Sequence, residues 1–204
     1  VTGTLRLSAP YSAGPFFLDD LIAEFASQFP EVDVELIYDD NKVDLISSGL
    51  DAAIRSSTLL APDTHAVPVG PDLTMTVVAS PDYLARQSRP AQPTDLLDHD
   101  TIGYAFGHGG QLAPWVFDGA DGSYSLQPKP KIVANDMRAL LRYAKSGLGL
   151  TYVYREIARA EIDEGAVVEV LADQVPSMPR YSLNYLSKKN MTRRLRAFVD
   201  LAKR

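Results

Sequence analysis

The stretch Asp44-Leu-Ile-Ser-Ser-Gly-Leu-Asp-Ala-Ala-Ile-Arg55 says more about the fold than any other part of the chain. It predicts the end of a short helix, a closing glycine at Gly49, and a small buried strand over Ala52–Ile54. Glycine just past a helix adopts the left-handed backbone that ends it, and Asp51 can bond its own backbone and shape the turn. In open α/β sheets, ligands collect at the carboxyl ends of strands. We therefore expect Arg55 to lie where it could contact an anionic ligand.

The residues before this stretch predict a strand, a helix and a second strand. Thr4–Ser8 alternates between apolar and polar side chains, as a half-buried strand does. Apolar side chains in residues 18–29 recur at the spacing of one helix face, and Pro30 ends that helix. Val32–Tyr38 alternates again. Strands separated by helices imply parallel pairing through right-handed crossovers.

The rest of the chain continues to alternate strands and helices. We expect strands at Leu73–Ala79, Lys131–Ala134, Leu150–Tyr154, Val167–Leu171 and Tyr181–Leu186. We expect a helix start at Pro81, an amphipathic helix with apolar residues from Met137 to Leu148 closed by Gly147, and a terminal helix burying Leu195, Phe198, Val199 and Ala202. The middle, Gly103–Gly122, is predicted to be loop-rich. Pro-rich connections near 61–71 and 174–179 bracket the middle third, which suggests two α/β lobes, the second inserted into the first.

Composition limits the classes of function. The chain has 204 residues, a formal net charge of −6 and no cysteine, so disulfides, thiolate metal sites and cysteine nucleophiles are excluded. The negative charge argues against a broad DNA-binding face. Basic residues do gather near the end, at Lys188, Lys189, Arg193, Arg194, Arg196, Lys203 and Arg204. A solvated helix face explains them better than a DNA-binding tail.

Two helix starts are candidate binding sites. The loop Ser8–Gly14 joins the first strand to the first long helix, where backbone N–H groups and the helix dipole favour an anion. The alternative is an exposed loop whose serines cap the helix. Asn135-Asp136 opens the second amphipathic helix in the same way, and capping alone would explain these residues. Arg55 could pair bidentately with the same anion, or form a structural salt bridge instead.

Signals for catalysis are few. The three histidines, His65, His99 and His108, fall in predicted loops without a metal-pair spacing, and no nucleophile elbow, zinc-protease motif or phosphate loop occurs. We therefore expect a protein that is not an enzyme, with no catalytic residues, no metal and no cofactor.

Several segments together resemble the effector-binding domain of LysR-type transcriptional regulators. The opening Gly3-Thr-Leu-Arg-Leu resembles the first strand of that family, and Leu45–Ile54 resembles its Asp-Leu…Gly-x-x-Asp-x-Ala-Ile signature. Further matching segments follow in the family's order: Phe25–Pro30 with Val32–Leu36, Val78–Leu84, Pro93–His99 and Ala144–Leu150.

This resemblance implies an α/β fold of two Rossmann-like lobes joined by two crossover segments, like type 2 periplasmic binding proteins. Lobe I would comprise residues 1–72 and 178–204, and lobe II residues 73–177. The implied effector lies between the lobes, and the family's contacts transfer to Ser8, Pro10, Tyr11, Ser12, Arg55, Ser56, Asn135 and Asp136.

The resemblance also implies partners. We expect a small-molecule effector, for example a small organic anion, and a homodimer through this domain, with a tetramer for the full-length protein. DNA would be bound only by an N-terminal helix-turn-helix domain that this chain lacks. The protein would be cytoplasmic, with no membrane contact. The rival hypothesis is a periplasmic solute-binding protein of a transport system, which shares the architecture.

Overall fold

The computed structural model describes residues 1–41, 43–56, 64–106, 110–186 and 191–204. The chain divides into two compact units. Unit 1 comprises Val1–Asp72 with Pro179–Arg204, and unit 2 comprises Leu73–Met178. In the described ranges, no helix has the length and apolar character needed to cross a membrane.

Unit 1 is built on a five-stranded mixed sheet. Its strands are β1 (Gly3–Ala9), β2 (Val32–Tyr38), β3 (Ala52–Ser56), β4 (His65–Val69) and β14 (Tyr181–Tyr185), in the order β2-β1-β3-β14-β4. β1 pairs in parallel with β2 and β3, whereas β14 runs antiparallel to β3 and β4. Its helices are α1 (Asp19–Gln28), α2 (Leu45–Ser48) and α6 (Arg193–Ala202), with a π-helical turn at Gly14–Leu18 before α1.

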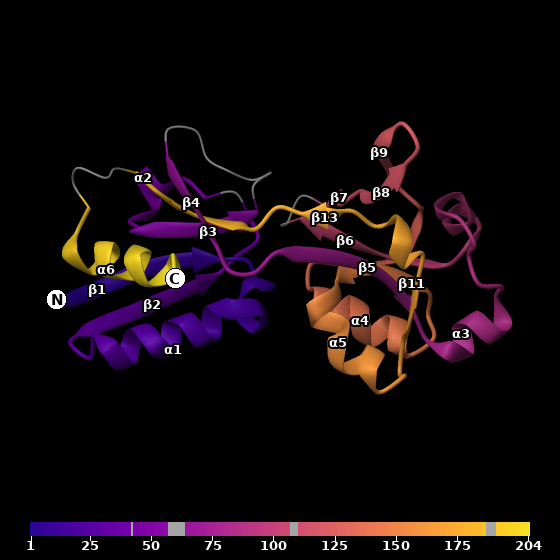
Figure 1. The fold of residues 1–204 in the computed structure, drawn as a ribbon, viewed down its shortest axis with the longest axis horizontal. Helices are drawn as coiled ribbons and strands as arrows, with labels where there is room; N and C mark the ends of the chain where they lie inside the picture. Colours follow the sequence, from indigo (N-terminus) through magenta and orange to yellow (C-terminus); the bar gives the residue numbers. More distant parts are fainter. Residues whose placement is uncertain (42, 57–63, 107–109, 187–190) are drawn as a thin grey trace. The chain divides into compact units, whose positions relative to one another are not determined.

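The core of unit 1 lies where α1 and α6 meet the sheet. Phe25 of α1 and Phe198 of α6 are both fully buried, and their rings meet at 5.3 Å. Figure 1 shows these two helices beside β1 and β2. The predicted apolar face of residues 18–29 is confirmed, because Leu18 and Phe25 are its fully buried members.

The stretch from Asp44 to Arg55 folds as its sequence predicts, with one exception. Asp44 caps α2 by accepting a hydrogen bond from the Ile46 N–H, and Gly49 ends the helix in the left-handed region, at φ 68°. The exception is Asp51. Its carboxylate accepts hydrogen bonds from the Arg6 N–H (2.9 Å) and from Arg194 Nη2 (3.3 Å). Asp51 therefore connects β1 to α6 instead of shaping its own turn.

Unit 2 is also a mixed sheet with helices packed on it. Its main strands are β5 (Leu73–Ala79), β6 (Thr101–Phe106), β10 (Pro130–Ala134), β11 (Leu150–Tyr154) and β12 (Val168–Val170), in the order β10-β6-β11-β5-β12. The short β7 (Gln111–Leu112) and β13 (Ser177–Met178) join its margins, and β8 (Trp115–Gly119) and β9 (Gly122–Leu126) form a separate hairpin. The helices are α3 (Pro81–Arg86), α4 (Met137–Lys145) and α5 (Arg155–Asp163), with 3₁₀ turns at Pro93–Asp98 and Ala172–Gln174. Leu140, Leu141 and Ala144 of α4 pack with Ile102 and Val153 of the sheet.

Three expectations about secondary structure were wrong, and one helix was missed. The segment Gly103–Gly122 is largely strand among its described residues, because Trp115 and Phe117 pack on Tyr152 and anchor the hairpin. His65 lies in β4 rather than in a loop. Leu148 is 40% exposed, because α4 ends before Gly147. The charge-rich helix α5 was not predicted at all.

The basic C-terminal residues belong to a packed helix. Leu195, Phe198, Val199 and Leu201 of α6 are buried, and Arg194 forms an ion pair with Asp51. The interpretation as a solvated helix face is therefore confirmed for Arg193, Arg196, Lys203 and Arg204, which are exposed, and is wrong for Arg194, which is half-buried. Lys188 and Lys189 lie outside the described residues.

Candidate functional site

The carboxyl end of β1 leads directly into the predicted binding loop. Ser8 is 1% exposed and Pro10 is buried, and the chain then turns through Tyr11 and Ser12 into the π-helical turn. The Ala13 N–H donates to the Pro10 carbonyl at 3.0 Å, which closes the turn. π-helical turns are rare and are frequent at functional sites. No serine side chain caps this helix start, so the capping interpretation of the loop is wrong.

Arg55 is buried against the same strand end. It is 3% exposed and donates three hydrogen bonds: Nη2 to Ser8 Oγ (2.8 Å), Nη1 to the Ile54 carbonyl (2.6 Å) and Nε to the Asn41 carbonyl (3.1 Å). None of the ion pairs between described residues involves Arg55, so the alternative of a structural salt bridge is not found there. The guanidinium holds Ser8 in place.

The charge of Arg55 is balanced at a distance. Burial lowers the pKa of Arg55, and the negative charges of Asp39 and Asp40 act in the opposite direction. Asp39 also accepts hydrogen bonds from the backbone N–H (2.8 Å) and the side-chain amide (2.6 Å) of Asn41. This carboxylate thereby fixes the turn that presents the Asn41 carbonyl to Arg55.

The hydroxyl of Ser8 has a defined direction of hydrogen bonding. Its oxygen accepts from Arg55, so its own proton is left as a donor. No acceptor for that proton is found among the described residues. A buried donor of this kind suits a ligand that brings an acceptor atom.

Ser12 is held by a residue that is far away in the sequence. Its Oγ lies 2.6 Å from the hydroxyl of Tyr181, the first residue of β14. Tyr181 is 1% exposed and also pairs in register with Ser56, the half-buried last residue of β3. Tyr181 therefore connects two predicted site residues, although sequence reasoning did not select it. Its only signal was its place at the start of the last predicted strand.

Tyr11 lies at the surface of the turn. It is 51% exposed, and its ring stacks on Tyr38 at 5.7 Å and 19°. The Tyr38 hydroxyl in turn donates to Asp19 Oδ1 at 2.7 Å. The stack presents an aromatic face beside the turn that holds Ser12.

Unit 2 contributes the second predicted helix start. Asp136 caps α4, because its Oδ1 accepts from the Arg138 N–H at 2.9 Å. Asn135 is exposed at the end of β10. The capping interpretation of Asp136 is therefore confirmed. A ligand contact at either residue stays a prediction.

The described residues contain no group of three or more His, Asp or Glu side chains arranged for a metal ion. Two of the histidines have structural partners: His65 packs on Tyr185 (5.7 Å), and His99 Nδ1 lies 3.0 Å from the Tyr83 hydroxyl. His108 lies outside the described residues.

The chain matches a known family along its whole length. The model of the LysR substrate binding domain matches residues 1–204. Among curated proteins, the chain is 32% identical over 202 residues to an uncharacterized HTH-type transcriptional regulator, YcaN, of Escherichia coli K12, covering 99% of the chain and 66% of that protein. It is 28% identical to the HTH-type transcriptional regulator PgrR of the same organism, covering 99% and 68%. The chain thus spans about two thirds of the length of these relatives.

Solved structures agree with this match. The regulatory domain of CrgA, a LysR-type transcriptional regulator from Neisseria meningitidis, superposes with a TM-score of 0.82 at 25% identity, covering 100% of this chain and 98% of that one. The full-length virulence activator AphB of Vibrio cholerae gives a TM-score of 0.83 at 21% identity, covering 100% of this chain and 68% of that one. The predicted fold class, α/β like type 2 periplasmic binding proteins, is confirmed.

Proposed function

Because the chain belongs to the LysR substrate-binding domain family, we propose that it senses a small metabolite and thereby modulates a DNA-binding oligomer. A ligand can shift the equilibrium between two arrangements of this oligomer only if it binds one of them more tightly than the other. The relatives that support regulation are named as transcriptional regulators. They do not favour the rival hypothesis of a periplasmic solute-binding protein. DNA contact, in this proposal, is made by a domain outside this chain, and the protein works in the cytoplasm without catalysing a reaction.

The effector-binding residues that we propose are Ser8, Pro10, Tyr11, Ser12 and Ser56, with Arg55 acting through Ser8. The observation that carries this proposal is the buried Ser8 hydroxyl, which Arg55 leaves as a donor. A small organic anion supplies the acceptor that this donor needs, and the family resemblance adds Asn135 and Asp136 as contacts from unit 2.

A thermal-shift screen of carboxylates, amino acids and aromatic acids tests this proposal. A compound that binds the folded protein raises the temperature of the unfolding midpoint. At a ligand concentration of a hundred times the dissociation constant, it adds about 2.7 kcal/mol to the free energy of unfolding. We expect Ser8→Ala to weaken a hit strongly, because it removes the free donor together with the oxygen that accepts from Arg55. Ser123→Ala, in the exposed β8–β9 hairpin, is the matched control. A hit with unchanged affinity for Ser8→Ala contradicts the proposed site, and turnover of a hit contradicts the non-catalytic role.

Dimerisation through this domain is supported by an acidic face on α1 of unit 1 and a basic face on α4 of unit 2. Residues 7–41 contain eight Asp and Glu and no Lys or Arg. Within them, Asp20 and Glu24 are exposed one turn apart on α1. In unit 2, Arg138, Arg142 and Lys145 are exposed on one face of α4. In a twofold dimer, one contact between an acidic and a basic face is made twice.

A charge exchange tests this interface. We expect Glu24→Lys or Arg142→Glu alone to weaken self-association in analytical ultracentrifugation, because like charges would then meet. The double variant should recover part of the loss. Glu164→Lys, an exposed site at the end of α5, is the control for net charge. If the double variant associates no better than the worse single variant, α1 and α4 do not meet in the dimer.

A further inference from the structure

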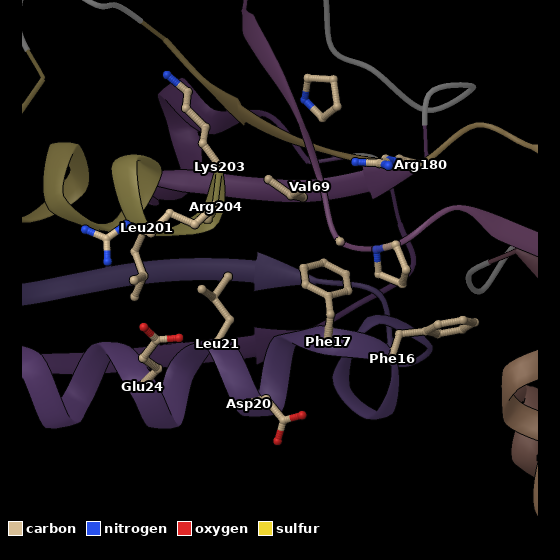
Figure 2. A pocket seen from close by; sticks show the side chains of 14 residues that line it. Phe16, Phe17, Asp20, Leu21, Glu24, Val69, Arg180, Leu201, Lys203 and Arg204 are labelled. Atoms are coloured by element: carbon tan, nitrogen blue, oxygen red, sulfur yellow. The ribbon is translucent and has the colours of Figure 1, made fainter.

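Unit 1 contains a groove that is separate from the predicted binding residues. It has a volume of about 550 Å³ and lies between α1, the end of β4 and the end of α6. Figure 2 shows Phe17 of the π-helical turn and Leu21 of α1 on one side of it, with Val69 and Leu201 opposite. Small-molecule sites are commonly about 300–1,000 Å³ and lined mainly by apolar side chains. The groove has the size of such a site, but its lining is mixed, because five of its fourteen residues are charged.

The backbone beneath the groove is shaped to admit the ring of Phe17. Gly70, which also lines the groove, has a φ of +74°, and a Cβ built on it would lie 2.6 Å from the Phe17 ring. Any larger residue at position 70 would therefore displace this ring. Phe17 belongs to the π-helical turn Gly14–Leu18.

The groove is connected to the turn that holds Ser12. The rings of Phe16 and Phe17, which both line the groove, lie 6.4 Å and 6.0 Å from the ring of Tyr181. Tyr181 is fully buried, and its hydroxyl is bonded to Ser12 Oγ at 2.6 Å. Because close-packed interiors transmit displacements, a shift of Phe17 reaches Ser12 through one intermediate side chain.

Three basic and two acidic side chains line the groove, so its formal charge is weakly positive. Lys203 and Arg204 line it, are exposed, and form none of the ion pairs between described residues. Arg180 lines it too, although it is paired with the exposed Asp72 at 2.7 Å. Of the two acids in the lining, Asp20 points away from the other labelled side chains in Figure 2. The Glu24 carboxylate keeps its negative charge, although its Oε1 accepts a hydrogen bond from Gln28.

We propose that this groove is a second small-molecule site, which takes an anion with an aromatic or similarly bulky apolar body. Its occupancy shifts Phe17 and, through Tyr181, the turn at Ser12. The groove does not depend on the effector site proposed above, although two of its lining residues, Asp20 and Glu24, also belong to the acidic face proposed for the dimer. The path from Phe17 through Tyr181 to Ser12, however, couples the groove to the turn at which the effector is proposed to bind.

Binding of 1-anilinonaphthalene-8-sulfonate, a fluorescent dye that is an aromatic sulfonate, tests the site. The change in dye fluorescence on titration with the protein measures its affinity. We expect Ala202→Trp to fill the groove and weaken the dye by about tenfold or more, whereas Ala26→Trp on the exposed face of α1 should leave it unchanged. The double variant Lys203→Glu/Arg204→Glu, which reverses two exposed charges, should weaken it about threefold to tenfold at a small cost in stability. Equal binding by all four proteins would overturn the site.

Amide chemical shifts test the coupling separately. On addition of the dye, the amides of Ser12 and its neighbours should shift in the natural protein. In Tyr181→Phe, which keeps the ring but loses the hydroxyl, the dye should bind with its affinity unchanged while the Ser12 shift is lost. Dye binding that leaves Ser12 unshifted in the natural protein would overturn the coupling. Both readouts use the dye alone, so they can fail while the effector site stands, and the reverse also holds.

Discussion

Replacing Arg55 by methionine tests whether the buried guanidinium supports the strand end. Methionine has a similar length but donates no hydrogen bond, so Ser8 Oγ and the carbonyls of Ile54 and Asn41 lose a donor. Three hydrogen bonds from a charged donor are together worth about 4.5–9 kcal/mol before the cost of burial. Burial lowers the pKa of Arg55, so part of that gain is offset.

We therefore expect Arg55→Met to lower the free energy of unfolding of unit 1 by about 2–4 kcal/mol. Arg55→Lys should cost about half as much, because an ammonium on a flexible stem can still reach one of the acceptors. Arg159→Met, at an exposed arginine with an ion pair of 3.5 Å, should change stability by less than about 0.5 kcal/mol.

Urea unfolding measures these losses, with far-UV circular dichroism reporting on the whole chain. Trp115, the only tryptophan, is 4% exposed in unit 2, so its fluorescence follows that unit. The loss should appear in the circular dichroism transition. If Arg55→Met costs no more than Arg159→Met, the guanidinium does not hold Ser8, and the reasoning about the strand end fails.

Two further substitutions test individual contacts. Gly70→Ala should lower the free energy of unfolding by about 2–4 kcal/mol, because it adds steric displacement of Phe17 to the cost of a left-handed backbone. Gly49→Ala, at φ 68° with nothing within 4 Å of a Cβ, should cost only about 1 kcal/mol. Equal losses in thermal unfolding would show that Phe17 adapts freely. Burial raises the pKa of Glu169, but its hydrogen bonds with Arg155 and Thr76 outweigh that effect and hold the pKa below its usual value. This stabilisation is present above the unfolded-state pKa and is lost as the pH falls through the lower folded-state value, so Glu169→Gln should flatten the loss of stability below about pH 4.5; an unchanged acid limb in a pH series of urea midpoints would contradict it.

Local signals in the sequence predicted much of unit 1. The cap at Asp44, the left-handed Gly49 and the alternating β2 depend on neighbouring residues, which a single sequence displays. Asp51 and Tyr181 form their contacts with residues 45 and 169 positions away. Local sequence patterns do not show which distant residues come into contact, so the roles of Asp51 and Tyr181 could not be predicted.

Unit 2 shows the same limit in its secondary structure. The Gly-rich segment around Trp115 forms strands because aromatic side chains pack on Tyr152 from β11. Likewise, α5 packs Ile157, Ala158 and Ile162 on the core of unit 2, a short apolar face that was missed among its charged residues. For the candidate site, the sequence predicted the strand end and the turn. It did not predict that Arg55 would be turned inward onto Ser8.

The central claim is that the end of β1 and the turn at Pro10–Ser12 bind the effector. Amide chemical-shift mapping with a hit from the thermal-shift screen tests it most directly. The account predicts the largest shifts at Ser8, Tyr11, Ser12 and Ser56, and their loss in Ser8→Ala. Saturable binding that leaves these amides unshifted and perturbs other residues would contradict it.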